Sequence, residues 1–302
     1  STRKAGGYSG NAGIGSRFGI AKIFGKNERL DTRFHEGYQG VLPNENSLLR
    51  PLQVISSNEI KFVKSLHQKK FREQEGLFIV EGEKLLSELL KSDWSVESIY
   101  ATAEWFSKNN CPPKIKTVEI KRAELERISA LASPNEVLAV VRQREFAFNE
   151  KLSQEGVTLI LEDVKDPGNL GTIIRIADWF GMKQVICSEQ SVELFNPKTV
   201  QSTMGSLFHL PIVYGDVVTL TQKIQQVQIP VYGAVMDGSS VYSESFPKAM
   251  ALIMGSESHG ISPHLDRFLE KRITIPSFGA AESLNVGVAT GIICSHYRQL
   301  HS

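Results

Sequence analysis

The sequence predicts an α/β protein with a mostly parallel sheet in its C-terminal part. Helical and strand-like segments alternate along the chain, and the strand candidates after residue 156 are short, apolar and not alternating. Such strands are typical of a parallel sheet that is covered on both faces. Polar segments rich in glycine follow three of these strands, and ligands bind beyond the carboxyl ends of parallel strands. We therefore expect one composite site at that edge of the sheet.

The composition is that of an ordinary globular protein and excludes several classes of protein, such as membrane-spanning and disulfide-rich ones. Apolar residues make up 41% and charged residues 22% of the 302 residues. No apolar run is long enough to span a bilayer, and the first residues lack the apolar core of a secretory signal. Cys111, Cys187 and Cys294 lack the spacing of a zinc site or a disulfide framework. We therefore expect a cytoplasmic protein without a metal site. The net charge of +1 gives no overall attraction to nucleic acid, so any surface that binds it must be a local basic patch.

Three segments are expected along the chain. Residues 1–52 are rich in Gly, Ser, Asn and basic residues and predict a flexible basic arm, which is either inert or touches RNA or a partner. Residues 53–148 predict a compact α/β domain that opens with a helix capped by Asn58 and running to about Lys69. The polar stretch 144–156 is interpreted as a linker to a larger domain, residues 157–302.

Within the larger domain, the pattern predicts five strands and four helices. The strand candidates are Val157–Glu162, Gln184–Cys187, Pro230–Val235, Ala251–Met254 and Arg272–Ile275. The helix candidates are Leu170–Phe180, Asn196–Met204, Val217–Val227 and Val286–Gln299.

The first loop, Asp166 to Gly181, opens a helix. Pro167 breaks the preceding chain, and Asn169 can cap the helix that follows. Arg175 lies near the first turns of this helix. It is either a solvated helix residue or a contact for an anion or a ribose phosphate.

The second loop, Ile253 to Ser262, places Glu257 between small residues just after a buried strand. Glycines there let a backbone approach a ligand closely. Glu257 can serve as an acid or base, a hydrogen-bond acceptor or a structural cap, while His259 is interpreted as an exposed loop residue. Ser256 stands where the nucleophile elbow of a hydrolase needs its first glycine, so serine hydrolysis is not expected.

The third loop, Ile275 to Ala289, leads into a helix that Ser283 or Asn285 can cap. Small residues in that helix, Gly287 and Gly291 among them, permit close packing against another helix or a second subunit. The chain has no Walker lysine and no strand-turn-helix GxGxxG, so it does not predict a nucleotide-triphosphate or dinucleotide site.

At these residues the sequence resembles the SpoU or TrmH-like family of RNA 2′-O-ribose methyltransferases, in the SPOUT superfamily. The resemblance covers about residues 157–299 and rests on three motifs in order: Asn169 with Arg175, then GSESHGIS, then ESLNV. FIVEGEKLLSELL (Phe78 to Leu90) resembles the family's N-terminal RNA-binding domain, which is like a ribosomal protein.

The resemblance implies a C-terminal α/β-knot, with a deep trefoil knot in a mostly parallel sheet, beside a smaller N-terminal α/β RNA-binding domain. It implies a homodimer formed through the knot, S-adenosylmethionine as the cofactor, and catalytic residues drawn from both subunits. The positions carried over as catalytic are Asn169, Arg175, Glu257, Ser283 and Asn285. Those carried over for the cofactor are Met254, Gly255, Ser256, Ile275, Pro276 and Leu284.

The implied reaction is methyl transfer to a ribose 2′-hydroxyl, in ribosomal RNA first and transfer RNA as the alternative. A non-catalytic RNA-binding or ribosome-assembly factor that keeps the knot is a second alternative. The family proposal makes Arg175 the base, but a guanidinium stays protonated in proteins, so a role in orienting the nucleotide is expected instead. The basic residues expected to bind RNA are Lys61, Lys64, Lys69, Lys70 and Arg72.

Overall fold

A computed structural model describes residues 55–302, all of which belong to one compact unit. The predicted arm, residues 1–52, lies outside the described residues. Over residues 55–302, every helix is too short or too polar to traverse a bilayer.

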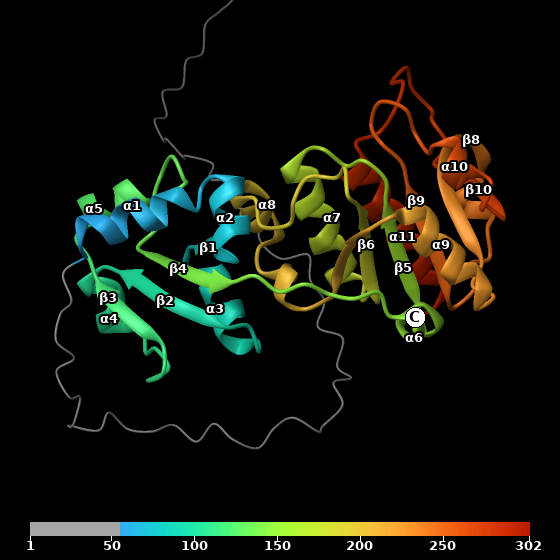
Figure 1. The fold of residues 1–302 in the computed structure, drawn as a ribbon. Helices are drawn as coiled ribbons and strands as arrows, with labels where there is room; N and C mark the ends of the chain where they lie inside the picture. Colours follow the sequence, from blue (N-terminus) through green and yellow to red (C-terminus); the bar gives the residue numbers. More distant parts are fainter. Residues whose placement is uncertain (1–54) are drawn as a thin grey trace, which may run out of the picture. The chain divides into compact units, whose positions relative to one another are not determined.

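The N-terminal part contains a four-stranded sheet in the order β1-β4-β2-β3 (Figure 1). Only β2 and β3 are parallel, and β4 runs antiparallel to both β1 and β2. The strands are β1 (Leu77–Glu81), β2 (Val96–Ala101), β3 (Lys116–Glu119) and β4 (Val137–Arg142). The helices are α1 (Ser57–Ser65), α2 (Lys69–Glu75), α3 (Glu83–Lys91), α4 (Ala103–Lys108) and α5 (Arg122–Ile128).

The first predicted helix is two helices. Ser56, not Asn58, caps α1, because its hydroxyl accepts the Glu59 N–H while the Glu59 carboxylate accepts the Ser56 N–H. This reciprocal pair is a capping box. The chain turns after Ser65 and begins α2 at Lys69.

The C-terminal part contains a six-stranded sheet in the order β10-β8-β9-β5-β6-β7, and every pair in it is parallel. The strands are β5 (Val157–Leu161), β6 (Gln184–Ser188), β7 (Ile212–Gly215), β8 (Val231–Ser240), β9 (Met250–Met254) and β10 (Lys271–Thr274). The helices are α6 (Glu150–Glu155), α7 (Pro167–Trp179), α8 (Pro197–Thr203), α9 (Val217–Gln226), α10 (Pro263–Asp266) and α11 (Val286–Leu300), with 3-10 turns at Ser206–Phe208 and Val241–Ser243. The predicted parallel sheet is confirmed. The strand β7 was not predicted, and the predicted linker contains α6.

The parallel sheet is covered on both faces, as its apolar strands require. On β5, Leu159 and Leu161 belong to the core cluster that includes α7 and α11, while Ile160 belongs to the cluster that includes α9 and α10. All three side chains are fully buried. Figure 1 shows α7 and α9 beside the sheet that contains β5 and β6.

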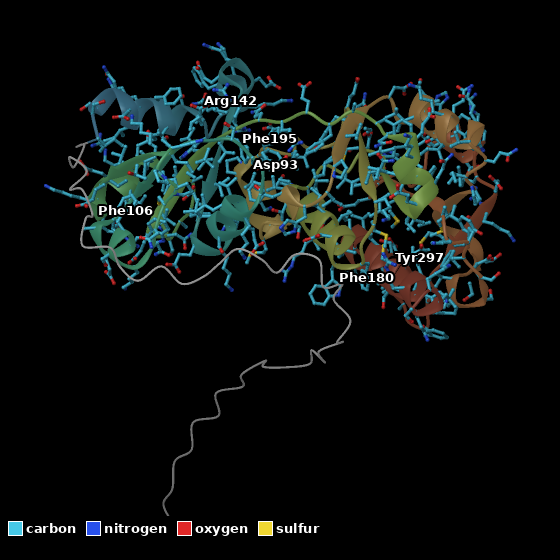
Figure 2. All side chains as sticks on the ribbon, turned by 90° about the horizontal axis from the view of Figure 1, so that it is seen from below. Asp93, Phe106, Arg142, Phe180, Phe195 and Tyr297 are labelled. Atoms are coloured by element: carbon cyan, nitrogen blue, oxygen red, sulfur yellow. The ribbon has the colours of Figure 1, made fainter. Side chains whose placement is uncertain are left out.

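One hydrophobic cluster is shared by the N-terminal and C-terminal sheets. Phe78 of β1 packs against Phe195 with ring centroids 4.6 Å apart, and Trp94 meets Phe208 edge-on at 5.4 Å. Figure 2 labels Phe195 among the side chains of this cluster. Aromatic pairs of this kind stabilise a contact beyond their buried area, by about 0.5–1.5 kcal/mol each.

Candidate functional site

Three side chains from the three predicted loops meet in one hydrogen-bonded chain. The amide nitrogen of Asn285 donates to the amide oxygen of Asn169 at 2.9 Å, and the amide nitrogen of Asn169 donates to a carboxylate oxygen of Glu257. We call Asn285, Asn169 and Glu257 the amide relay. The three loops that were expected to lie together therefore do meet, and each contributes one member of the relay.

The first member of the relay is held by the start of α7. Asp166, not Asn169, is the N-cap, and its carboxylate accepts the Asn169 N–H at 2.8 Å. Pro167 follows in the first turn, where its missing N–H has no cost, so the helix starts earlier than the sequence pattern indicated. The Asn169 hydrogen bond, together with Lys198 at 3.2 Å, lowers the pKa of Asp166 below its usual value. Because only the backbone N–H of Asn169 takes part in capping α7, its side chain is available for the relay.

The loop after β9 is closed on itself. Ser256 and Gly260 exchange two backbone hydrogen bonds of 2.9 and 3.0 Å, and the Ser256 hydroxyl accepts the His259 N–H at 3.0 Å. A Cβ at Gly255 would lie 2.2 Å from the carbonyl carbon of Gly260, so only glycine fits there. This closed turn fixes where Glu257 leaves the backbone.

The third member of the relay begins α11. The amide oxygen of Asn285 accepts the N–H groups of Gly287 and Val288 at 2.9 and 3.2 Å, which makes Asn285, and not Ser283, the N-cap. Gly287 then faces α7, where a Cβ would lie 3.3 Å from the Thr172 methyl group. The predicted close packing of this helix is confirmed, and it holds Asn285 against Asn169.

A cavity of about 840 Å³ lies beside the relay. It is lined by all six residues predicted to hold a cofactor: Met254, Gly255, Ser256, Ile275, Pro276 and Leu284. Glu257, Ser283 and Asn285 line it as well. Sites for small molecules and cofactors are commonly 300–1,000 Å³ and largely apolar with a few polar groups, so the cavity can accept a cofactor.

Part of the cavity wall was not predicted. Arg272 and Ile273 of β10 are consecutive, but they pair with Gly233 and Ser239 of β8, so residues 234–238 bulge out of the ladder with β10. Ala234 still pairs with Met254 of β9. Ala234, Val235 and Met236 of this bulge line the cavity. A Cβ at Gly238 would lie 2.6 Å from the backbone of Arg272, so the bulge depends on a glycine there. A five-residue bulge leaves no simple sequence pattern.

Asn169 and Arg175 are the two catalytic candidates that do not line the cavity. Asn169 is joined to it through the relay, whereas Arg175 is exposed on α7. Arg175 follows Asn169 by six residues, which is about 9 Å along a helix and about 120° around it. Arg175 therefore does not point where Asn169 points.

The basic residues of α1 and α2 divide into two groups. Lys61, Lys64, Lys69 and Lys70 are exposed. Arg72 is only 1% exposed; its guanidinium pairs with Glu193 and donates to the carbonyl oxygen of Leu66 at 2.8 Å. The prediction that Arg72 binds RNA is wrong for this structure, because its charge is already used inside the protein.

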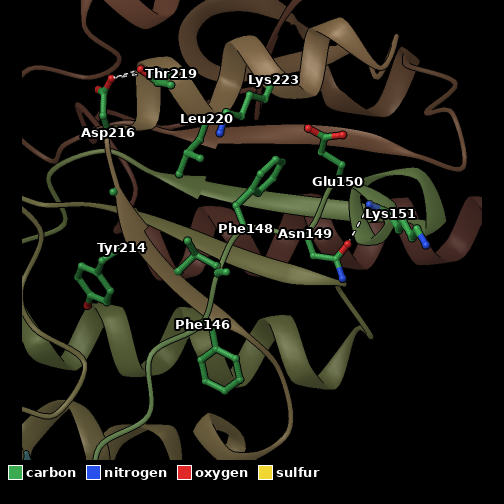
Figure 3. Close-up of a pocket in the computed structure, with 13 residues that line it drawn as sticks. Phe146, Phe148, Asn149, Glu150, Lys151, Tyr214, Asp216, Thr219, Leu220 and Lys223 are labelled. Carbon is green, nitrogen blue, oxygen red and sulfur yellow. Dashed lines mark hydrogen bonds between the residues drawn. The ribbon is translucent and has the colours of Figure 1, made fainter.

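A second cavity, of about 690 Å³, lies by β7, at the opposite end of the strand order from β10. Figure 3 shows Phe146 and Phe148 of the predicted linker with Tyr214 of β7 and Leu220 of α9 around them. The charged residues that line this cavity are two acids and two lysines: Glu150, Asp216, Lys151 and Lys223. The cavity therefore does not favour a ligand of either charge.

The remaining reactive groups do not form a further centre. Residues 55–302 contain no group of three or more His, Cys, Asp or Glu that could hold a metal ion. Burial raises the pKa of the Cys187 and Cys294 thiols to about 12, so neither is a nucleophile near neutral pH.

Comparison with protein families gives two adjacent matches. Residues 156–295 match the model of the SpoU rRNA Methylase family. Residues 57–139 match the model of the MRM3-like substrate binding domain.

A curated relative and two solved structures are similar over most of the chain. The chain is 31% identical over 251 residues to the 23S rRNA (guanosine(2553)-2′-O)-methyltransferase RlmP of Bacillus subtilis, covering 83% of this chain and 100% of that protein. A putative RNA methyltransferase of the TrmH family from Porphyromonas gingivalis is 38% identical, with a TM-score of 0.75, covering 81% of this chain and 98% of that one. The AdoMet-bound rRNA methyltransferase from Sinorhizobium meliloti is 28% identical, with a TM-score of 0.73, covering 82% and 98%.

Proposed function

Because this chain belongs to the SpoU rRNA methylase family, we propose that it transfers a methyl group from S-adenosylmethionine to a ribose 2′-hydroxyl of ribosomal RNA. The observation that carries the proposal is the amide relay, which joins the three motif loops beside a cavity of cofactor size. The relative named above acts on 23S rRNA, which favours ribosomal over transfer RNA.

The cavity fits S-adenosylmethionine in size and chemistry. Met254, Ile275 and Leu284 offer an apolar surface, and the glycine at position 255 lets the backbone approach closely. The Glu257 carboxylate on the wall complements a positive charge. When bound, the cofactor supplies a methyl group on a cationic sulfur. The chain's own residues hold it and exclude water.

The ribose hydroxyl is a weak nucleophile, so alignment with the methyl carbon contributes much of the acceleration. Arg175 orients the nucleotide and stabilises the negative charge that develops on the oxygen, since its guanidinium stays protonated. Because Arg175 does not line its own cavity, it completes the site of a second copy of the chain. The protein is therefore a homodimer in this proposal.

Exposed apolar side chains support the dimer. Leu284 is 49% and Val288 is 51% exposed beside the start of α11, and Phe278 is 96% exposed in the preceding loop. Large side chains of this kind, grouped next to a site, are typical of an interface. A second copy that packs on this surface brings the partner's Arg175 to the cavity.

The C-terminal domain is a trefoil knot in this proposal. The chain leaves β9, passes beyond β8 to form β10, and then returns so that Asn285 reaches α7. This return across neighbouring strands is compatible with a knot, and the resemblance to the SpoU family supports it, because knots are rare. Residues 53–148 then bind the RNA, with Lys61, Lys64, Lys69 and Lys70 as phosphate contacts.

Methyl transfer tests the proposed activity. Purified full-length protein, labelled S-adenosylmethionine and RNA from cells that lack the protein are expected to give label in 23S rRNA. Mapping of 2′-O-methylation in the same cells should show one missing rRNA site. Label in transfer RNA alone would support the transfer RNA alternative. An absence of cofactor binding in calorimetry would leave the non-catalytic assembly factor.

The RNA surface is tested by salt dependence. Lys64→Ala with Lys70→Ala removes two exposed charges, so the slope of log affinity against log salt should decrease by roughly 1–2. Lys151→Ala with Lys223→Ala, beside the second cavity, is the matched control for net charge. An equal effect of both double variants contradicts the assignment to α1 and α2.

A further inference from the structure

The amide relay has a fixed direction. The Gly287 and Val288 N–H groups can only donate, so they hold the Asn285 amide with its oxygen toward α11. The Asn285 nitrogen must then face Asn169, whose oxygen accepts it at 2.9 Å. This turns the Asn169 nitrogen toward Glu257. The hydrogen bonds therefore run in one direction, from Asn285 to Asn169 and from Asn169 to the Glu257 carboxylate.

A carboxylate at the end of such a chain is held as an acceptor. Asn169 engages Oε1, and the exposed side chain lines the cavity. The cations around the site have other partners: Lys198 pairs with Asp166, and Arg272 pairs with Asp237 and Asp266. An ionised carboxylate has lone pairs on both oxygens, so Glu257 can accept a further proton donor from the cavity side.

We propose that Glu257 is the catalytic base that takes the proton of the ribose 2′-hydroxyl, and that Asn169 and Asn285 are positioning residues for it. This rests on the proposed function. The Glu257 carboxylate accepts the proton while the hydroxyl oxygen forms a bond to the methyl carbon. The bond between sulfur and that carbon breaks, and its electron pair stays on sulfur. The sulfonium and the carboxylate both become neutral, so charge balances without a further reactant.

The other candidate groups are less suited to this role. Arg175 has no lone pair to accept a proton, because the guanidinium remains charged. His259 lines the cavity, but among residues 55–302 only its backbone N–H is engaged in a hydrogen bond, so its ring is not oriented. A general base must be held within hydrogen-bond reach of the proton it takes. Two other carboxylates among residues 55–302 line the cavity, Glu282 and Asp266, and Asp266 is paired with Arg272. Of these carboxylates, the relay holds Glu257.

The direct test is Glu257→Gln, which keeps an oxygen that can accept from Asn169 but has no basic carboxylate. The single-turnover rate with saturating rRNA and S-adenosylmethionine should fall about 10²–10⁴-fold. RNA affinity and melting temperature should stay close to wild type. Cofactor affinity by calorimetry should fall, because the cavity wall loses a negative charge, and saturating cofactor keeps this effect out of the measured rate. Glu270→Gln, an exposed carboxylate that does not line the cavity, is the matched control and should keep the wild-type rate.

The positioning role of Asn169 is tested by a double-mutant cycle. Asn169→Ala alone should slow single turnover by about 10–100-fold, because it releases the carboxylate. In the Glu257→Gln background it should add little, since residues that act as a unit are not additive. Full additivity of the two losses contradicts a relay that acts through Glu257.

The outcomes separate this assignment from the proposed function. If the wild-type protein methylates no RNA, the proposed function fails, and the base assignment fails with it. If wild type is active and Glu257→Gln keeps more than roughly a third of its single-turnover rate, only the base assignment is overturned. A large loss in His259→Gln with a small loss in Glu257→Gln assigns the proton to the histidine instead.

Discussion

Replacement of Asn285 separates the structural role of this residue from its role in the relay. The side chain makes three hydrogen bonds, two to the first N–H groups of α11 and one to Asn169. Asn285→Ala removes all three. A lost N-cap costs about 0.5–2 kcal/mol and a lost side-chain hydrogen bond about 0.5–1.5 kcal/mol. The exposed position favours the low ends, so we expect a loss of about 1–2.5 kcal/mol.

Asn285→Asp should behave differently. Aspartate caps helices as well as asparagine does, and its charge at a helix N-terminus is favourable by about 0.3–1 kcal/mol. Stability should therefore stay near wild type. A carboxylate cannot donate to Asn169, however, so the Asn169 amide must lose a partner or turn its oxygen toward Glu257. The relay is broken in a protein that remains folded.

Two measurements distinguish the variants. At about 2–4 °C per kcal/mol for a chain of this size, Asn285→Ala should melt roughly 2–10 °C below wild type, and Asn285→Asp within a few degrees of it. Single-turnover methyl transfer should fall about 10–100-fold in both, which is about 1.4–2.7 kcal/mol in the barrier. A wild-type rate in Asn285→Asp would refute the reasoning, because the cap alone would then explain the residue.

Three further predictions concern other parts of the molecule. Arg72→Met leaves the carboxylate of Glu193 without its cation and should lower the free energy of unfolding by about 2–4 kcal/mol in denaturant titrations, whereas a surface cation would cost less than about 1 kcal/mol. Gly255→Ala must displace the closed loop, so cofactor affinity in calorimetry should fall at least about tenfold with little change in RNA affinity; unchanged cofactor affinity contradicts the close approach. Alkylation of the native protein at pH 8 should spare Cys187 and Cys294, whose thiol pKa is about 12, and urea should expose both; rapid native labelling of either contradicts its burial.

The strands at the centre of the parallel sheet could be predicted because burial on both faces requires uninterrupted apolar residues. The pattern at β5 and β9 is of this kind. The edge strand β7 was missed because only its first two residues are buried. The start of α7 was misplaced because Pro167 looks like a chain break, although the first turn of a helix tolerates it.

The location of the candidate site could be predicted from the sequence, but the direction of the hydrogen bonds within it could not. Parallel strands bring their carboxyl ends together, so the meeting of Asn169, Glu257 and Asn285 follows from the order of strands and loops. The direction of the relay depends on which side-chain atom caps α11, and a residue name does not contain that information. The burial of Arg72 was not predictable either, because its partner Glu193 is 121 residues away in the sequence.

Formation of the relay also depends on the order in which segments of the chain are synthesised and fold. Asn169 meets partners 88 and 116 residues downstream, and the second of them opens the last helix of the described chain. Contacts of such long sequence separation must wait for the intervening chain and slow the final steps of folding. A nascent chain can form β5 and α7 well before α11 leaves the ribosome. The site therefore cannot be complete until the start of α11 has been synthesised and has folded against α7.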